Sequence, residues 1–521
     1  MIKSNIGGRV SAMIKSVFGG GSVALFFYAI AFFFNGFCQA KAATNNAASA
    51  SFIDVSNAVA ISYLGDTVSI PPGTNSWTST LFISGITLSG SGTNLTFIRD
   101  SEPSLSSPII EMIGTNQLTR LSNMSIADNT NSIDSYKGKV QVIADSPQQW
   151  RIDDVLFNRL NGANILNYGT AVSVIDHCTF IQRVGISIES WGDGDVSWST
   201  PPTYGTSNAL YIEDCIFTNL TPGNSDMVAF DGYGGSRSVF RHNIVLNSFW
   251  NNHGTETSHR FRGTRQFEIY NNTFAYNQQF YTVMDFRSGT GVVFSNTCSG
   301  FNSLAWLQNY RSTDKFFPFD GVTGFNPWDS NSPIIFGTNT FVGTDGSQVF
   351  STTNVNWTTN QWVGYTMDDA NQGTFGLIVA NTKNTFSLHS VWGSGWPQPV
   401  FTNGDIVKFY YCYAALDQIG RGSGDLLINA GVDGWGGVAV TNAALGNSSY
   451  PREASEPLYA WSNTMNGVIT GIASDYPNIQ ENRDFFNNTP KPNYTPFPYP
   501  HPLAATGWRW EVVITNIPTA Q

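Results

Sequence analysis

The sequence predicts an all-β protein whose main body is a right-handed parallel β-helix with a small antiparallel β insertion. Three observations support this prediction. A short segment recurs through the middle of the chain, its residues alternate between apolar and polar, and Asp, His or Asn stands near the same place in each copy. A repeat of roughly 20–50 residues is typical of solenoids, and alternation is typical of strands with one buried face.

The recurring segment is clearest between residues 150 and 300. Its copies are 150–157, 174–180, 211–217, 239–245, 267–274 and 292–298. The last residues of successive copies lie 23 to 37 positions apart, which suits one coil of a β-helix with loops of different lengths. Successive coils should stack about 4.8 Å apart. Asn243, Asn272 and Asn296 are then expected to form a ladder in the turn, because Asn tolerates left-handed backbone geometry.

Two cysteines, Cys178 and Cys215, occupy equivalent places in neighbouring copies and should also stack. We interpret them as small apolar core residues, with a disulfide between them as the alternative. So few cysteines in a chain of 521 residues do not form a disulfide framework.

The ends of the chain differ from this repeat. Lys3, Arg9 and Lys15 precede an apolar stretch at 23–37 and small residues at 40–42. Residues 1–43 are therefore predicted to be a signal peptide, with a retained signal anchor as the alternative. The protein is expected to be secreted or periplasmic, without stable membrane insertion after cleavage. We assign an N-terminal cap and β-helix to 44–348, the β insertion to 349–411, further coils to 412–488 and a proline-rich strap to 489–521.

Composition limits the class of partner. The net charge is −11, so nucleic acid is not an expected partner. Hydrophobic residues make up 41% of the chain, which excludes a disordered protein. An overall negative charge does not exclude an acidic substrate, since a local cluster of arginines can still bind one.

Three phrases of the sequence resemble the pectate-lyase-like superfamily of right-handed β-helix proteins. They are the opening Gly-Asp-Thr-Val-Ser-Ile-Pro-Pro-Gly of 65–73, the Gly-Ser-Gly-Thr turn of 90–93, and the coils in which Asn precedes a returning apolar residue. The resemblance covers roughly 53–345 and part of 412–485. It implies the β-helix fold, which several unrelated chemistries share.

The strands that follow the repeated segments are expected to form another sheet. An alignment on Leu166, Ile188, Phe230, Phe261, Phe286 and Leu307 as the inward row places Asn167, Glu189, Asp231, Arg262, Arg287 and Gln308 in an outward row. A second outward row contains Arg260, Asp285 and Trp306.

These outward rows predict the candidate site. Glu189 and Asp231 on adjacent coils would repel each other, so that one holds a proton near neutral pH or the pair binds Ca²⁺. Arg262 is expected to pair with Asp231, and Arg287 with Asp285 or a substrate anion. His253 and His259 are candidates for proton transfer. The expected substrate-binding residues are Trp191, Tyr233, Arg260 and Trp306.

The leading functional hypothesis is an exported monomer that cleaves a uronate-containing polysaccharide. In a lyase, Arg262 or Arg287 would neutralise the uronate, and His253, His259 or another arginine would remove the proton. In a hydrolase, Glu189, Asp231 and Asp285 would supply acid and base. The alternative is a non-catalytic surface or matrix protein that binds glycans or builds structure. An ion-pair ladder without catalytic use is the structural alternative for the outward row.

Overall fold

The computed structural model describes residues 42–103, 107–128, 138–198, 200–223, 227–254, 262–308, 452–474 and 479–505, with shorter pieces between 334 and 425. The predicted signal peptide lies outside the described residues except for its last two positions. No helix in the described ranges has both the length and the hydrophobicity of a membrane span.

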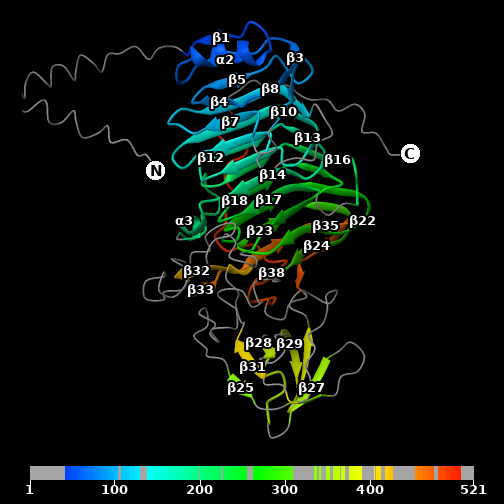
Figure 1. Ribbon diagram of the computed structural model, residues 1–521. Coiled ribbons are helices and arrows are strands. Elements are labelled where there is room, and N and C mark those ends of the chain that lie inside the picture. The colour runs from blue at the N-terminus through cyan, green and yellow to red at the C-terminus, as the bar shows by residue number, and fades with distance from the viewer. Residues whose placement is uncertain are drawn as a thin grey trace, which may run out of the picture. The chain divides into compact units, whose positions relative to one another are not determined.

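The described coils stack in sequence order, and each contributes up to three short strands (Figure 1). These strands pair in parallel with those of the neighbouring coils and form three ladders. The predicted fold class, a parallel β-helix with a small antiparallel sheet, is confirmed.

The first ladder contains the first strand of each coil, and β1 (Thr44–Asn46) pairs with its first member. Its strands are β2 (Thr67–Ser69), β5 (Thr87–Ser89), the first part of β8 (Thr119–Asp128), the first part of β10 (Gln149–Asn161), β12 (Val172–Asp176), β15 (Leu210–Glu213), β18 (Arg237–Arg241), β21 (Gln266–Tyr270), β23 (Thr290–Phe294), β34 (Leu458–Trp461) and β38 (Phe485–Asn487).

The second ladder follows after a short turn. Its strands are β3 (Gly73–Trp77), β6 (Thr96–Asp100), the second parts of β8 and β10, β13 (Thr179–Val184), β16 (Ile216–Asn219), β19 (Ile244–Leu246), the first parts of β22 (Thr273–Phe286) and β24 (Thr297–Leu307), and β35 (Asn463–Met465). A short strand, β36 (Val468–Thr470), pairs antiparallel with β35.

The third ladder closes each coil and carries the candidate site. Its strands are β4 (Leu81–Ser84), β7 (Ile110–Ile113), β9 (Val140–Ile143), β11 (Ile165–Tyr168), β14 (Ile186–Trp191), β17 (Val228–Tyr233), β20 (Phe249–Asn252), the last parts of β22 and β24, and β37 (Ala473–Ser474).

The core is a stack of inward side chains, one above another. In the first ladder, Ile152, Ile175 and Ile212 are direct cross-strand partners and are fully buried. In the second ladder, the ring of Phe180 lies 4.8 Å from that of Phe157 and 4.7 Å from that of Phe217. Each such side chain contributes about 1.5–3 kcal/mol by burial, so alternation in the sequence becomes a continuous apolar column.

The turn between the first and second ladders explains the recurring Asp, His and Asn. His177, Asp214 and His242 have φ angles of 53°, 55° and 58°, in the left-handed region that these residues tolerate. Beside them, the predicted asparagine ladder is confirmed. The Nδ2 of Asn243 donates to Asn272 at 3.1 Å, and that of Asn272 donates to Asn296 at 2.9 Å.

The cysteines of this turn are core residues. Cys178, Cys215 and Cys298 are buried free thiols. The disulfide alternative for Cys178 and Cys215 is therefore excluded, and the interpretation as core residues is confirmed.

A short helix covers the first coil. Helix α2 (Phe52–Ala60) begins after Ser51, whose side chain accepts a hydrogen bond from the backbone N–H of Asp54. Val55 and Ala58 are buried against the coil. A helix at this position prevents the open edge of the solenoid from pairing with another chain.

The antiparallel sheet has seven strands in the described residues. They are β25 (Ile334–Phe336), β26 (Asn339–Phe341), β27 (Gln348–Thr352), β28 (Tyr365–Asp369), β29 (Phe375–Asn381), β30 (Thr385–His389) and β31 (Val407–Tyr411). Its first strand begins at Ile334, so the boundary that we drew at 348 between β-helix and insertion was wrong. Strands as short as β25 and β26 show too little periodicity to distinguish a coil from an antiparallel sheet.

Two further segments complete the described chain. Strands β32 (Arg421–Asp425) and β33 (Arg452–Ser455) form an antiparallel pair within the range that we assigned to further coils. Helix α3 (Gly194–Trp198) lies in the long loop between β14 and β15.

The segment 489–505 lies across the outward face of the first ladder. Tyr494 donates to Glu268 at 2.6 Å, Arg241 donates to the carbonyl of Phe497 at 2.7 Å, and Arg151 donates to that of Leu503 at 2.9 Å. The segment thus runs back over the coils from the C-terminal side toward the N-terminal side. His501, which the sequence did not single out, is buried, and its ring makes a tilted contact with that of Tyr211 at 4.7 Å.

Candidate functional site

Two outward rows of the third ladder form the candidate site. The acidic row contains Glu189, Asp231, Asn251, Asp285 and Trp306, which are successive cross-strand partners. The ring row lies two positions further along each strand and contains Tyr168, Trp191, Tyr233, His253 and Arg287.

Inward neighbours hold the acidic row in place. Ile188, Phe230 and Trp250 immediately precede its first three members and are fully buried in the core. Because side chains alternate along a strand, burial of these residues forces their successors outward. The adjacency of Glu189 and Asp231 that the sequence predicted is confirmed.

Glu189 is a nearly buried carboxyl with one strong donor. Its side chain is 7% exposed, and the indole Nε1 of Trp191 donates to its Oε1 at 2.6 Å. Burial, followed by the charge of Asp231, raises the pKa of Glu189 to about 7. Glu189 therefore holds a proton for much of the time near neutral pH.

Asp231 lies in the opposite environment, because several donors point at it. Tyr233 donates to its Oδ2 at 3.0 Å, Asn251 donates to its Oδ1 at 3.1 Å, and His253 Nε2 lies 3.3 Å from its Oδ2. Three polar side chains therefore converge on the two oxygens of Asp231. Burial, followed by the neighbouring acids Asp231 and Glu189, raises the pKa of Tyr233 well above its usual value, so Tyr233 remains a donor.

Arg287 and His253 form a chain that ends at Asp231. Arg287 Nη1 lies 3.1 Å from His253 Nδ1. The same Nη1 lies 3.4 Å from His253 Nε2, and this Nε2 lies 3.3 Å from Asp231 Oδ2. The sequence predicted His253 as a proton-transfer group, and the structure places it between Arg287 and the carboxyl of Asp231.

The rings of this row stack on one another. The centroids of Trp191 and Tyr233 are 4.5 Å apart, and those of Tyr233 and His253 are 4.0 Å apart. Tyr233 is thus covered on both faces, so it presents only its edge and hydroxyl to the outside. Trp191 and Tyr233, which the sequence predicted to bind substrate, donate hydrogen bonds to Glu189 and Asp231.

Asp285 is a second carboxyl with a raised pKa. Burial, opposed by Arg287 and His253, raises its pKa to about 6. Gln308 donates to its Oδ2 at 3.0 Å, and Arg287 Nη2 lies 3.4 Å from the same oxygen. The predicted pair of Arg287 and Asp285 is confirmed. Its Oδ1 is buried and has no hydrogen-bond partner within the described parts of the chain.

Trp306 ends the acidic row with an exposed indole. It is 38% exposed, and its ring meets that of Tyr281 edge-on at 5.5 Å. Its partner on the next coil is Ala473, which is too small to cover the indole. Among the residues expected to bind substrate, Trp306 thus has an exposed ring.

The expected position of Arg262 was wrong. Arg262 is buried, and its Nη2 forms an ion pair with Asp417 Oδ1 at 2.7 Å rather than with Asp231. Its guanidinium lies 4.8 Å from the ring of Trp198. The coil after β17 is completed by β20, so the alignment that used Phe261 skipped a strand. His259 and Arg260 lie outside the described residues.

Sequence reasoning also missed Asn251 and misaligned β11. Asn251 occupies the position between Asp231 and Asp285, and the signal was the alternating Phe-Trp-Asn-Asn of β20. In β11 it is Ile165, not Leu166, that pairs with Ile188. Both errors arise because a strand of four residues fits two registers equally well.

The acidic pair does not fit the expected Ca²⁺ site. Calcium is held by six to eight oxygen ligands, typically several carboxylates and carbonyls. Here N–H and O–H donors point at oxygens of both Glu189 and Asp231. Within the described residues, no group of three or more His, Cys, Asp or Glu side chains is arranged to hold a metal ion.

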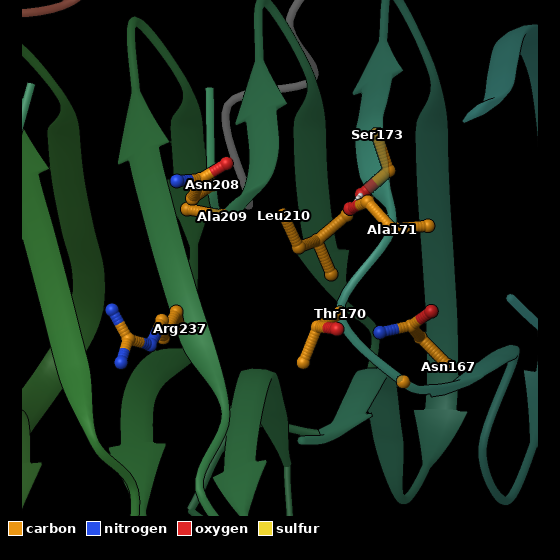
Figure 2. A pocket seen from close by; sticks show the side chains of 9 residues that line it. Asn167, Thr170, Ala171, Ser173, Asn208, Ala209, Leu210 and Arg237 are labelled. Carbon is orange, nitrogen blue, oxygen red and sulfur yellow. Dashed lines mark hydrogen bonds between the residues drawn. The ribbon is translucent and has the colours of Figure 1, made fainter. Parts of the chain in front are cut away.

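A small pocket lies outside these rows, between the turn after β11 and the starts of β15 and β18 (Figure 2). Its lining residues are Asn167, Gly169, Thr170, Ala171, Ser173, Asn208, Ala209, Leu210 and Arg237. Arg237 already donates to the carbonyl oxygens of Ser197 and Pro201 and to the side chain of Thr203. The cationic group of this pocket is therefore used within the protein.

Comparisons with known proteins give distant similarities of fold. No protein-family model and no curated protein matches the sequence. An alginate lyase from Paenibacillus sp. str. FPU-7 is similar with a TM-score of 0.33 and 14% identity, over 50% of this chain and 97% of that one. The catalytic domain of a GH87 alpha-1,3-glucanase has a TM-score of 0.27 and 11% identity, over 49% and 58%.

A viral protein is similar as well. The Dettilon tailspike protein has a TM-score of 0.28 and 11% identity, over 68% of this chain and 90% of that one. The chain is thus distantly similar in structure to polysaccharide lyases, glycoside hydrolases and phage tailspikes.

Proposed function

We propose that this protein hydrolyses glycosidic bonds of a polysaccharide on the outward face of the third ladder. The observation that carries the proposal is the pair of adjacent carboxyls in opposite environments. Glu189 has a pKa raised to about 7, while Asp231 accepts from Tyr233 and Asn251 and faces His253. A protonated and an ionised carboxyl side by side are what glycoside hydrolysis requires.

The first step uses both groups at once. Glu189 transfers its proton to the glycosidic oxygen as the bond from that oxygen to the anomeric carbon breaks, and the carboxylate of Asp231 forms a bond to the same carbon. In the second step, water attacks the anomeric carbon, its proton passes to Glu189, and the bond to Asp231 breaks. Each residue returns to its starting state.

The spacing of the coils predicts the stereochemistry. Direct partners on adjacent coils lie about 4.8 Å apart, close to the separation of about 5–5.5 Å at which two carboxyls give retention at the anomeric carbon. Asp285 is two coils beyond Asp231. We therefore assign it to binding the substrate rather than to the reaction.

The described residues support hydrolysis better than elimination. A lyase needs a cation to neutralise the uronate carboxylate, and Arg262, one of the two expected, is paired with Asp417 in the interior. Arg287 lies beside Asp285 and His253. A uronate-containing substrate, which the sequence predicted, would be placed with its carboxylate near Arg287.

The deciding experiment incubates the purified protein with a panel of neutral and uronate-containing polysaccharides. We expect new reducing ends without the absorbance of an unsaturated product, and a first product that keeps the anomeric configuration by NMR. Activity should fall as the pH rises above about 7, where Glu189 loses its proton. Unsaturated products would instead support a lyase, and retention without cleavage would support a glycan-binding protein; either contradicts the proposal.

Export through residues 1–43 is part of this proposal, because a large polysaccharide is met outside the cytoplasm. Expression of the full chain followed by N-terminal sequencing tests it. We expect the protein in the periplasm or the medium, beginning near residue 43. Protein that stays in the cytoplasm with its first residues intact would contradict it.

A further inference from the structure

The ring row continues beyond the candidate site toward the N-terminal cap. Ile143 is the cross-strand partner of Tyr168, and Ile113 is the partner of Ile143. Both isoleucines point outward from the ends of their strands and are 43% and 39% exposed. We call Ile113, Ile143 and Tyr168 the N-terminal strip.

We propose that the N-terminal strip binds uncharged sugar units of the polysaccharide on one side of the bond that is cut. This inference rests on the proposed function and adds the direction of the bound chain and the chemistry of its sugars. The glycan would lie across the strands, along the stack of coils, with its cleaved bond at Glu189 and Asp231.

The register supports a single continuous surface. Ile113, Ile143, Tyr168 and Trp191 stand on four consecutive coils, so the row advances by about 4.8 Å at each step. An extended glycan advances by a similar length per sugar, and its sugars carry apolar C–H faces. Methyl groups and ring edges at this repeat therefore meet one sugar on each coil.

The N-terminal strip lacks charged side chains, and this favours uncharged sugars. Its three side chains carry no charge, and along the described row the first permanently charged side chain is Arg287. Nearby Lys139 is paired with Asp100 at 2.7 Å and with Asp128 at 2.9 Å. A uronate carboxylate placed on Ile143 would lose water without gaining a partner, which disfavours charged sugars at this end.

The place of these isoleucines differs from that of another exposed isoleucine, Ile244. Ile244 is 41% exposed but stands on β19 of the second ladder, between Ile216 and Thr273 and away from the candidate site. Single exposed apolar residues are common, whereas a row that leads into a candidate site indicates a binding surface. Ile244 is therefore a matched control for Ile143.

The test measures binding without cleavage. Affinity electrophoresis of full-length Glu189→Gln uses gels that contain glucomannan, xylan, methyl-esterified pectin or de-esterified pectin. We expect retardation by at least one of the uncharged polymers. Adding Ile143→Asp should weaken the affinity for that polymer about tenfold. Adding Ile113→Asp should also weaken it. Adding Ile244→Asp should leave it unchanged, and circular dichroism verifies that each variant is folded.

The outcomes separate the strip from the proposed function. One outcome is that the parent protein cleaves a polysaccharide while Glu189→Gln binds it equally tightly with and without Ile143→Asp or Ile113→Asp. The proposed role of the N-terminal strip would then be wrong, and the proposed function would stand. Retardation by de-esterified pectin alone, or equal loss in the Ile244→Asp control, also overturns the strip. A protein that neither binds nor cleaves any member of the panel overturns both.

Discussion

On the outward face of the first ladder, buried charges are paired with opposite charges and covered, whereas on that of the third ladder two buried carboxyls stand side by side. Arg241 and Glu213, both fully buried, approach to 2.6 Å beneath the segment 489–505. Glu189 and Asp231 occupy the same kind of position, on adjacent strands of one ladder, but the partner of each is another acid. The fold is the same at both places, so the difference lies in the side chains.

The comparison separates a face whose buried charges are satisfied from one whose buried acids are neighbours. A buried ion pair that is also hydrogen-bonded satisfies its charges locally. Burial and the neighbouring Asp231 raise the pKa of Glu189, so its ionisation at high pH destabilises the fold. Residues that cost stability and are nonetheless present are expected at functional sites.

The largest effect expected is on activity. Glu189→Gln should lower kcat about 10³-fold at pH 6, because the general acid is lost while size and the acceptor for Trp191 are kept. Glu111→Gln is the matched control, since Glu111 lies outward on β7, where Gln141 of the next coil is its partner. Reducing-end assays on the best substrate of the panel measure both. Equal activity of the two variants would place the reaction elsewhere.

The same substitution on the covered face should affect stability instead. Glu213→Gln leaves the buried guanidinium of Arg241 without its carboxylate, which should lower the free energy of unfolding by about 3 kcal/mol. Chemical denaturation at pH 7 measures this change. A variant as stable as the parent would show that the covered face is not held by its ion pairs, and the contrast between the faces would fail.

Glu189→Gln should have the opposite effect on stability, and only at high pH. The pKa of Glu189 is raised from 4.5 to about 7 on folding, so its contribution to stability is full below pH 4.5 and is lost as the pH rises through 7. Gln has no charge to bury. At pH 8 the variant should therefore be more stable than the parent by on the order of 3 kcal/mol, with no difference at pH 4. Thermal melts of both proteins at both pH values measure this difference in stability. A difference that does not depend on pH would contradict the assigned pKa of Glu189.

The smallest effect is expected at the edge of the covered face. Tyr499 stacks on His242 and donates to Asp214 at 2.6 Å while remaining exposed. Tyr499→Phe should cost about 0.5–1 kcal/mol, because water replaces an exposed hydrogen bond. Activity should not change. If Tyr499→Phe lowered the free energy of unfolding as much as Glu213→Gln, the segment 489–505 would be held at its edge rather than at Arg241.

The sequence alone was enough for the fold class and for part of the site. Alternation and the recurring Asn of the turn follow from strand geometry and backbone preferences, which are local properties. The alignment of Glu189 with Asp231 succeeded because Ile188 and Phe230 are strongly apolar and the strands are six residues long. Where strands were four residues long, as in β11 and β20, register depended on the neighbouring coil, and the predictions for Leu166 and Arg262 were wrong.

The electrostatic character of each carboxyl was decided only by the tertiary structure. Trp191 and Tyr233 occupy equivalent positions in the sequence pattern, yet the donors gathered around Asp231 come from β17, β20 and the residue after β20. Arg262 forms its ion pair with Asp417, which is 155 residues away in the sequence. Sequence by itself determined that charges would lie on outward rows. Which charges are paired depends on loops and returning segments, because ion pairs form between whichever groups the folded chain brings within a few ångströms.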